Sequence, residues 1–192
     1  TNSGGPPAGR LLEADDAAFE AAIGRILLAA QQLVQLVLPG MQAAGYGRVV
    51  NVLSGGMYTQ KIHVDDPQSK QGAYSGSVAY ARAKRGLMIL TEEWALRWAK
   101  DGIVVNAMHP GWADTPGVVS ALPEFHRLTG KVLRSPEEGA DTIVWLAAAT
   151  EAGKVSGEFW LDRQPHLKHV LPGTRETPAE RRKLLKALAG FV

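Results

Sequence analysis

Hydrophobic and polar positions follow helical periods in two long stretches of this chain. Apolar residues recur every three or four positions over 14–44, as in an amphipathic helix. Gly45 is placed to end this helix, and Pro39 should kink or shorten its last turn. A second helix is predicted over 77–100, with one apolar stripe formed by Leu87, Leu90, Trp94 and Trp98.

Short apolar runs between the helical stretches predict strands. The runs 48–54 and 103–108 are almost continuously apolar, which is typical of strands buried on both faces, and 157–161 is a shorter one. Further helices are expected near 136–149 and over 177–189. This alternation predicts an α/β fold: a doubly wound, mostly parallel sheet with helices on both faces, in one domain of 192 residues.

Composition narrows the class of protein. The chain is 45% hydrophobic and 21% charged with a net charge of +2, as in an ordinary globular domain. Without cysteine it has no disulfide, thiolate nucleophile or Cys-ligated zinc. We expect its first residues not to act as a signal peptide, and no apolar run is expected to reach the ~20 residues of a membrane span. We therefore expect a cytoplasmic protein with no nucleic-acid or membrane partner.

Three features allow a functional interpretation but are better explained structurally. His63 with Asp65 and Asp66 is more typical of a solvated loop than of a metal site, so no metal is expected. His109 precedes a proline and is interpreted as a turn residue rather than a base. The basic run 181–186 is expected to be the solvated face of an ordinary helix.

Candidate chemistry gathers where the predicted strands end. Ser54 is expected to be the last residue of one strand, and Pro110 and Gly111 follow the next. Tyr80 and Lys84 lie four residues apart on the connecting helix, so their side chains share one face. Because ligands of open α/β sheets bind at the carboxyl ends of the strands, these residues should converge on one cleft.

That convergence suits hydride transfer to a carbonyl group. A phenol has an ordinary pKa near ~10, which is too high for efficient proton transfer at neutral pH. An ammonium at about 4 Å, in an environment of ε ~20, favours the phenolate by ~4 kcal/mol before desolvation. Lys84 is placed to supply this charge to Tyr80, and the Ser54 hydroxyl can bond the reacting oxygen.

These motifs, taken in order, resemble the short-chain dehydrogenase/reductase family. The resemblance rests on a strand-end serine, the Tyr-x-x-x-Lys helix and the run 106–115, and it covers essentially the whole chain. Residues 2–4 are similar to the end of the family's Asn-Asn-Ala-Gly segment. Residues 54–117, with 159–163, resemble one dehydrogenase/reductase subgroup, whereas 1–50 look closer to bacterial acyl-carrier-protein reductases.

The resemblance implies a Rossmann-like fold and an NAD- or NADP-dependent oxidoreductase that interconverts small-molecule carbonyls and secondary alcohols. Tyr80 would be the acid/base, Ser54 would hold the substrate oxygen, and Lys84 would tune Tyr80 and bind the nicotinamide ribose. The two long helices would pack against their copies in a homodimer or homotetramer. Cofactor-binding residues would be Asn2, Gly4, Tyr80, Lys84, Pro110, Gly111, Ala113 and Thr115.

Three departures from the family pattern affect these expectations. The glycine-rich pyrophosphate loop is absent, so the first strands and the residue that selects NAD or NADP are expected to lie outside this sequence. Residues 1–192 alone should therefore bind cofactor poorly. Ile26 stands about where the family has a catalytic Asn that supports a water relay behind Lys84. The segment 57–76 is unusually long and is expected to shape the substrate pocket.

Two other functions remain as alternatives. The chain could be a truncated or degenerate relative without independent activity, acting as a binding or oligomerisation module. An epimerase or dehydratase with the same Tyr-x-x-x-Lys is less favoured, because those relatives usually carry a larger C-terminal substrate domain.

Overall fold

The computed structural model describes residues 24–66, 75–114, 124, 127 and 129–189. Its main elements are the helices α2 (Ala29–Ala44), α3 (Gly76–Trp98), α6 (Pro136–Ala148) and α7 (Pro178–Ala189), and the strands β1 (Gly47–Val52), β2 (Ile103–Met108), β3 (Phe159–Leu161) and β4 (Gln164–His166). Short helical turns include the π-helical η1 (Gly24–Leu28) and the 3-10 helices η2 (Gly55–Thr59), η3 (Ala99–Asp101), η4 (Gly130–Val132) and η5 (Glu151–Lys154).

The described strands form one sheet in the order β1-β2-β3-β4. β1 pairs with β2 in parallel, in a register that sets Val52 opposite Met108, so the two carboxyl ends lie level. β3 also runs parallel to β2, and only β4 is antiparallel. The predicted mostly parallel sheet is confirmed, whereas β4 has no counterpart in the sequence-based prediction.

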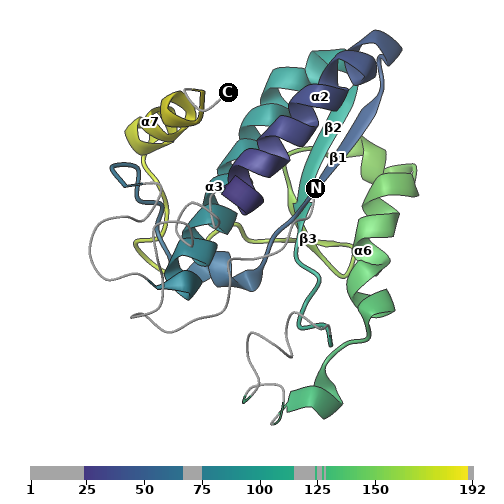
Figure 1. Ribbon diagram of the computed structural model, residues 1–192. Coiled ribbons are helices and arrows are strands. Elements are labelled where there is room, and N and C mark those ends of the chain that lie inside the picture. Colours follow the sequence, from purple (N-terminus) through teal and green to yellow (C-terminus); the bar gives the residue numbers. More distant parts are fainter. Residues whose placement is uncertain (1–23, 67–74, 115–123, 125–126, 128, 190–192) are drawn as a thin grey trace.

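Helices cover both faces of this sheet, as predicted. α2 and α3 lie side by side on one face and α6 lies on the other, while α7 packs beside α3 (Figure 1). The larger apolar core fills the space between α3 and the sheet, and a smaller one lies under α6. The smaller cluster consists of Val52, Met108, Leu146, Ala152 and Trp160.

α3 is buried around most of its circumference, so the single apolar stripe expected for it is too narrow. The four stripe residues are indeed buried, and the indoles of Trp94 and Trp98 stack with centroids 5.4 Å apart. Met88 and Ile89, outside the stripe, are buried as well. The reason is that α3 is covered by the sheet, by η1 and by α7. This is the helix that carries Tyr80.

Backbone geometry requires a glycine in the turn after α2 and another in the turn before β2. Gly45 ends α2 in the left-handed conformation with φ 61°, as the sequence predicts. Gly102 also has a left-handed φ of 69°, and a Cβ there would stand 2.2 Å from the Gly45 carbonyl oxygen. The turns that precede β1 and β2 are therefore in direct contact at Gly45 and Gly102, with no room for a side chain between them. Pro39 lies inside α2, which nevertheless continues to Ala44.

Several predicted boundaries need correction. The strand predicted over 48–54 ends at Val52, so Ser54 is not its last residue but the N-cap of η2. A 3-10 helix therefore follows Ser54 directly, and Met57 within it is fully buried. Residues 14–23 of the first predicted helix lie outside the described residues. The other predicted helices and strands are found, with Ser135 and Glu138 forming a capping box at the start of α6.

Within the described residues, the helical stretch Ile26–Ala44, formed by the end of η1 and by α2, is long and apolar enough to cross a membrane by length and composition. The expectation that no apolar run approaches that length is therefore wrong by this criterion. Core helices of soluble proteins reach the same length and apolar composition. In this helix Ile26, Leu27, Ala30 and Val34 lie in the core.

Candidate functional site

Ser54 and Tyr80 meet beyond the carboxyl end of β1. Ser54 caps η2 by accepting a hydrogen bond from the Gly56 amide at 3.2 Å. Its hydroxyl also lies near the ring of Tyr80, on the first turns of α3, since a Cβ on Gly56 would meet both side chains. Burial raises the pKa of the Tyr80 phenol, and the interaction with Ser54 opposes part of that rise. The structure thus pairs the predicted proton donor with the predicted orienting hydroxyl.

Lys84 lies one turn after Tyr80, but its ammonium is directed elsewhere. Its Nζ donates a 2.7 Å hydrogen bond to the carbonyl oxygen of Val52, at the end of β1. It stands 5.6 Å from the centroid of the Tyr80 ring. Burial lowers the pKa of Lys84 to about 8. The expected electrostatic lowering of the Tyr80 pKa by Lys84 does not emerge in this geometry, where desolvation of the phenol is the larger effect.

A cavity of about 310 Å³ opens beside Ser54 and Tyr80. Ser54 and Tyr80 line one side of it, and Pro110 and Gly111 line another. Because β1 and β2 end level, the segment after each strand reaches the same cavity. The remaining lining is mostly apolar: Val52, Leu53, His109, Trp112, Ala113, Pro136, Gly139, Ala140 and Ile143.

The segment after β2 is held by Arg134. Ala113 forms a parallel bridge with Arg134, whose backbone accepts from the Asp114 amide at 2.8 Å and donates to the Trp112 carbonyl at 2.9 Å. Gly111 has a φ of 76°, and a Cβ there would stand 2.8 Å from the Arg134 guanidinium. That guanidinium makes a two-point ion pair with Asp162. The cavity wall is therefore anchored to the β3–β4 hairpin.

That hairpin has no sequence signal of the usual kind. Its two turn residues, Asp162 and Arg163, both have positive φ, at 52° and 59°, although neither is glycine or asparagine. Arg163 pairs with Asp141 on α6 and donates its amide to the Thr142 hydroxyl at 3.2 Å. The ion pairs of both turn residues hold the hairpin against α6 and the cavity wall, and sequence reasoning missed them.

His109 is more than the turn residue expected from the sequence. Its amide donates to the Trp160 carbonyl at 2.9 Å, and its imidazole lines the cavity against Gly55. Burial, with the nearby charges of Arg134 and His166, lowers its pKa to about 4. The ring is therefore neutral at pH 7. The histidine directly before the Pro-Gly pair was visible in the sequence, but its orientation was not.

Other predicted site residues are placed as follows. Asn2, Gly4 and Thr115, which the resemblance assigns to the cofactor, lie outside the described residues. So does 67–74 of the segment expected to shape the substrate pocket. Ile26, at the position of the family Asn, is 1% exposed within η1. An apolar buried side chain cannot hold a water relay behind Lys84.

The segment 63–66 is less solvated than expected. Asp66 is buried and faces His63 at 4.0 Å. Asp65 pairs with Lys183 of α7. Across the described residues, no group of three or more His, Cys, Asp or Glu side chains is arranged to hold a metal ion. The basic run 181–186 is likewise only partly solvated, because Arg181 pairs with two carboxylates.

Comparison with known proteins places these features in a family context. A family model described as short chain dehydrogenase matches residues 1–124. The chain is 44% identical over 158 residues to the Dehydrogenase/reductase SDR family member 12 of Bos taurus, covering 81% of this chain and 49% of that protein. The protein of the same name from Homo sapiens is 42% identical over 154 residues, covering 79% and 48%. The chain thus spans about half the length of these curated relatives.

Among solved structures, the fold resembles a variant of actinorhodin polyketide ketoreductase with NADPH. The match has a TM-score of 0.64 and 27% sequence identity, and it covers 82% of this chain and 62% of that one. The two curated relatives belong to the subgroup that residues 54–117 resemble. The predicted family resemblance and fold class are therefore confirmed.

Proposed function

Because the chain belongs to the short-chain dehydrogenase/reductase family, we propose that it carries the catalytic half of an NAD(P)-dependent oxidoreductase that interconverts a carbonyl and a secondary alcohol. One observation supports this most strongly. Ser54 and Tyr80 line one cavity together with Pro110 and Gly111, and the Ser54 side chain lowers the pKa of the Tyr80 phenol. A proton donor and an orienting hydroxyl thus face a space in which a small carbonyl compound can sit.

In the direction of reduction, Tyr80 gives its phenolic proton to the substrate oxygen as that oxygen gains negative charge. Ser54 donates a hydrogen bond to the same oxygen and fixes its position. Lys84, whose Nζ donates to the Val52 carbonyl and stands 5.6 Å from the centroid of the Tyr80 ring, would bind the nicotinamide ribose beside Tyr80. In oxidation, Tyr80 removes the hydroxyl proton instead. A bound nicotinamide cofactor supplies or accepts the hydride.

The described residues fit the nicotinamide end of such a cofactor. A volume of about 310 Å³ is at the lower end of those found for ligand sites. Gly111 leaves backbone alone at the cavity wall, where a Cβ would meet the Arg134 guanidinium. Pro110, Gly111 and Ala113 would hold the ring, and Tyr80 with Lys84 would hold its ribose. Asn2, Gly4 and Thr115 keep their proposed roles in binding NAD or NADP.

We also propose that the protein assembles with copies of itself through α2. Leu33, Leu36 and Val37 follow one another at helical spacing and are all exposed. They lie beside, and not among, the residues by which α2 packs into the core, which are Ala30, Gln31 and Val34. The same surface supports the alternative function, a binding or oligomerisation module without activity, and so does the buried Ile26 in place of the family Asn.

The proposed chemistry is tested by Tyr80→Phe in the full-length protein. Removal of the titrating oxygen should lower turnover at least about a hundredfold. The melting temperature should stay within a few degrees of wild type, because the ring remains. Reduced nicotinamide is followed by absorbance over a panel of aldehydes and ketones, with Tyr46→Phe as the control, since Tyr46 is exposed and far from the cavity in sequence. Wild-type rates for Tyr80→Phe would exclude Tyr80 as the acid/base.

A further inference from the structure

A fully buried arginine stands beside the catalytic residues and has no part in the proposed chemistry. Arg85 follows Lys84 on α3 and is 0% exposed. An arginine remains charged and costs several kcal/mol to bury without partners. Its guanidinium has two: Nη2 donates to the Met57 carbonyl at 3.0 Å, and Nη1 donates to the Lys168 carbonyl at 2.6 Å. It therefore joins three segments that are distant in sequence.

The first of these bonds leads to Ser54. Met57 is itself fully buried, and its amide donates to the Ser54 carbonyl at 3.1 Å. The carbonyl of Met57 thus accepts a hydrogen bond from Arg85, while the amide of the same residue donates one to Ser54. Two hydrogen bonds separate the guanidinium from the residue that meets Tyr80.

The second bond leads to the C-terminal segment 166–177, which passes between β4 and α7. Beside the bond from Arg85 to Lys168, the Tyr58 hydroxyl donates to the Leu167 carbonyl at 2.5 Å. Tyr58 lies in η2, the turn that follows Ser54. The segment 166–177 is therefore joined to this turn directly as well as through Arg85.

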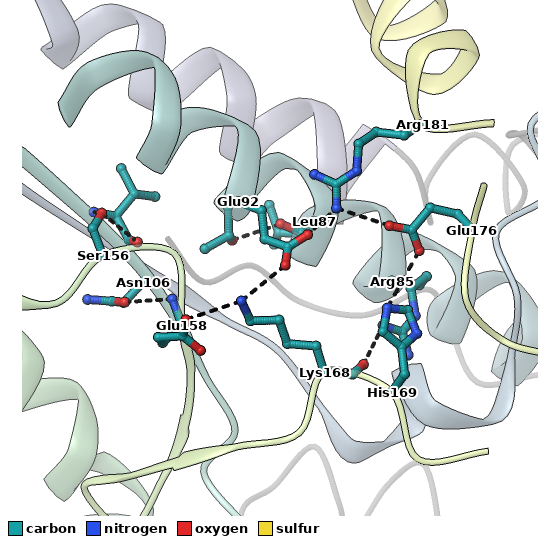
Figure 2. A network of polar contacts seen from close by, with 12 residues as sticks. Arg85, Leu87, Glu92, Asn106, Ser156, Glu158, Lys168, His169, Glu176 and Arg181 are labelled. Carbon is teal, nitrogen blue, oxygen red and sulfur yellow. Dashed lines mark hydrogen bonds and ion pairs between the residues drawn. The ribbon is translucent and has the colours of Figure 1, made fainter. Parts of the chain in front are cut away.

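Ion pairs hold the same segment to α3. Figure 2 shows Glu92 of α3 between Lys168 and Arg181, and Glu176 between Arg181 and His169. Burial raises the pKa of Glu92, but the bonds from Arg181 and Lys168 outweigh it and hold that pKa below its ordinary value. Glu92 therefore stays charged at neutral pH. The segment is fixed by charge on one side and by the Arg85 and Tyr58 bonds on the other.

We infer that Arg85 is a positioning residue that couples the C-terminal segment 166–177 to residues 54–59, the Ser54 turn. Through this coupling, Arg85 holds the Ser54 side chain in place beside Tyr80. This rests on the function proposed above for Ser54 and Tyr80. A guanidinium suits the role because its rigid fork can serve two carbonyl groups at once, whereas an ammonium is a point donor on a flexible stem.

The coupling is tested in the full-length protein, with tyrosine ring carbons labelled for NMR and assigned through Tyr→Phe variants. In Arg85→Met, the Ser54 turn should relax and weaken the interaction with Tyr80, so the pKa of Tyr80 should rise further. Tyr58 is an internal reference, because the charge of Arg85 lowers the pKa of Tyr58 directly. The pKa of Tyr58 should therefore rise in Arg85→Met whether or not the Ser54 turn relaxes. A rise at Tyr58 alone would overturn the coupling.

Amide hydrogen exchange gives an independent measure. In Arg85→Met we expect exchange to accelerate on the order of tenfold in both 54–59 and 166–169, since each loses a hydrogen bond. Arg97→Met is the matched control, an exposed arginine on the same helix, and should match wild type. Acceleration in 166–169 alone would show that Arg85 only anchors the C-terminal segment, and the inference would be wrong.

Arg85→Lys separates position from charge and serves if Arg85→Met does not fold. A lysine keeps the cation but cannot span both carbonyl groups, so the pKa of Tyr80 and the exchange of one segment should still rise. Wild-type behaviour of Arg85→Lys would show that charge alone suffices, against a positioning role. None of these readouts needs turnover. If Tyr80→Phe stays active while these shifts occur, the proposed function fails and the coupling stands.

Discussion

At the residue scale, the site is organised by what burial does to ionisable side chains. Tyr80 and Lys84 both lie in surroundings that disfavour their charged forms, which raises one pKa and lowers the other to about 8. At neutral pH, Tyr80 is therefore a protonated phenol, the state from which it can donate, and Lys84 gives up its proton only above about pH 8. For Tyr80, the interaction with Ser54 opposes part of the rise, whereas the shift at Lys84 comes from burial.

Burial of Lys84 also predicts how stability depends on pH. Below about pH 8, the folded and unfolded states both hold the Lys84 proton, and burying the charge costs up to about 3 kcal/mol. Between about 8 and 10.5 the folded state loses this proton while the unfolded state keeps it, so this group's contribution to stability increases with pH.

Lys84→Met should therefore unfold at higher denaturant than wild type at pH 7, and its advantage should shrink toward pH 10. Chemical denaturation of both proteins at the two pH values measures this difference. Lys100→Met, at an exposed lysine just beyond the same helix, should show no such narrowing. An advantage that grows with pH would contradict the assigned burial of the Lys84 charge.

At the element scale, the site depends on strands that end level and on the turns that lead into them. β1 and β2 are in register from Gly47 opposite Ile103 to Val52 opposite Met108. The turns before them touch where Gly102 meets Gly45. This contact fixes the relative start of the two strands. Their ends, from which Ser54 and Pro110 follow, are fixed with it.

Gly102→Ala should lower the free energy of unfolding by ~2 kcal/mol or more, because a side chain at φ 69° is strained and would clash with the Gly45 oxygen. Gly40→Ala is the comparison, since a Cβ at this helical position meets nothing within 4 Å. It should be neutral or add up to ~1 kcal/mol. Urea unfolding of the two variants measures both effects, and equal stabilities would show that the Gly45–Gly102 contact carries no constraint.

At the scale of the whole molecule, one face of α2 is left apolar and exposed. Leu36 is 78% exposed, and Leu33 and Val37 flank it on the same side. Scattered exposed apolar residues are ordinary, but three at helical spacing form a continuous patch. In a symmetric dimer, such a patch would bury itself against its own copy.

Leu36→Glu should weaken self-association at least about tenfold, because association would then bury a charge. Light scattering of the full-length protein should show a dimer or tetramer for wild type and a shift toward monomer for this variant. Gln35→Glu, at an exposed position off the patch, should assemble as wild type does. A well-folded wild-type monomer would end the proposal.

The sequence by itself determined the elements and the spacing of the site. Apolar periods, the cap at Ser135 and the glycine at 45 reflect contacts within one or two turns of chain, so they can be recognised locally. Helical geometry alone set Tyr80 and Lys84 one turn apart. Nearly continuous apolar runs indicated β1 and β2, and their parallel pairing brought Ser54 and Pro110 to one cavity.

Only the tertiary structure decided which groups these side chains meet. The Lys84 ammonium bonds Val52, from another element, and Arg85 joins Met57 to Lys168. These contacts link positions 28 to 83 residues apart, and no local period encodes them. The β3–β4 turn could not be recognised locally either, because neither of its positive-φ residues is glycine. Both are held by ion pairs with distant residues, Arg134 and Asp141. Burial, and with it every shifted pKa at the site, depends on the packed molecule rather than on residue type.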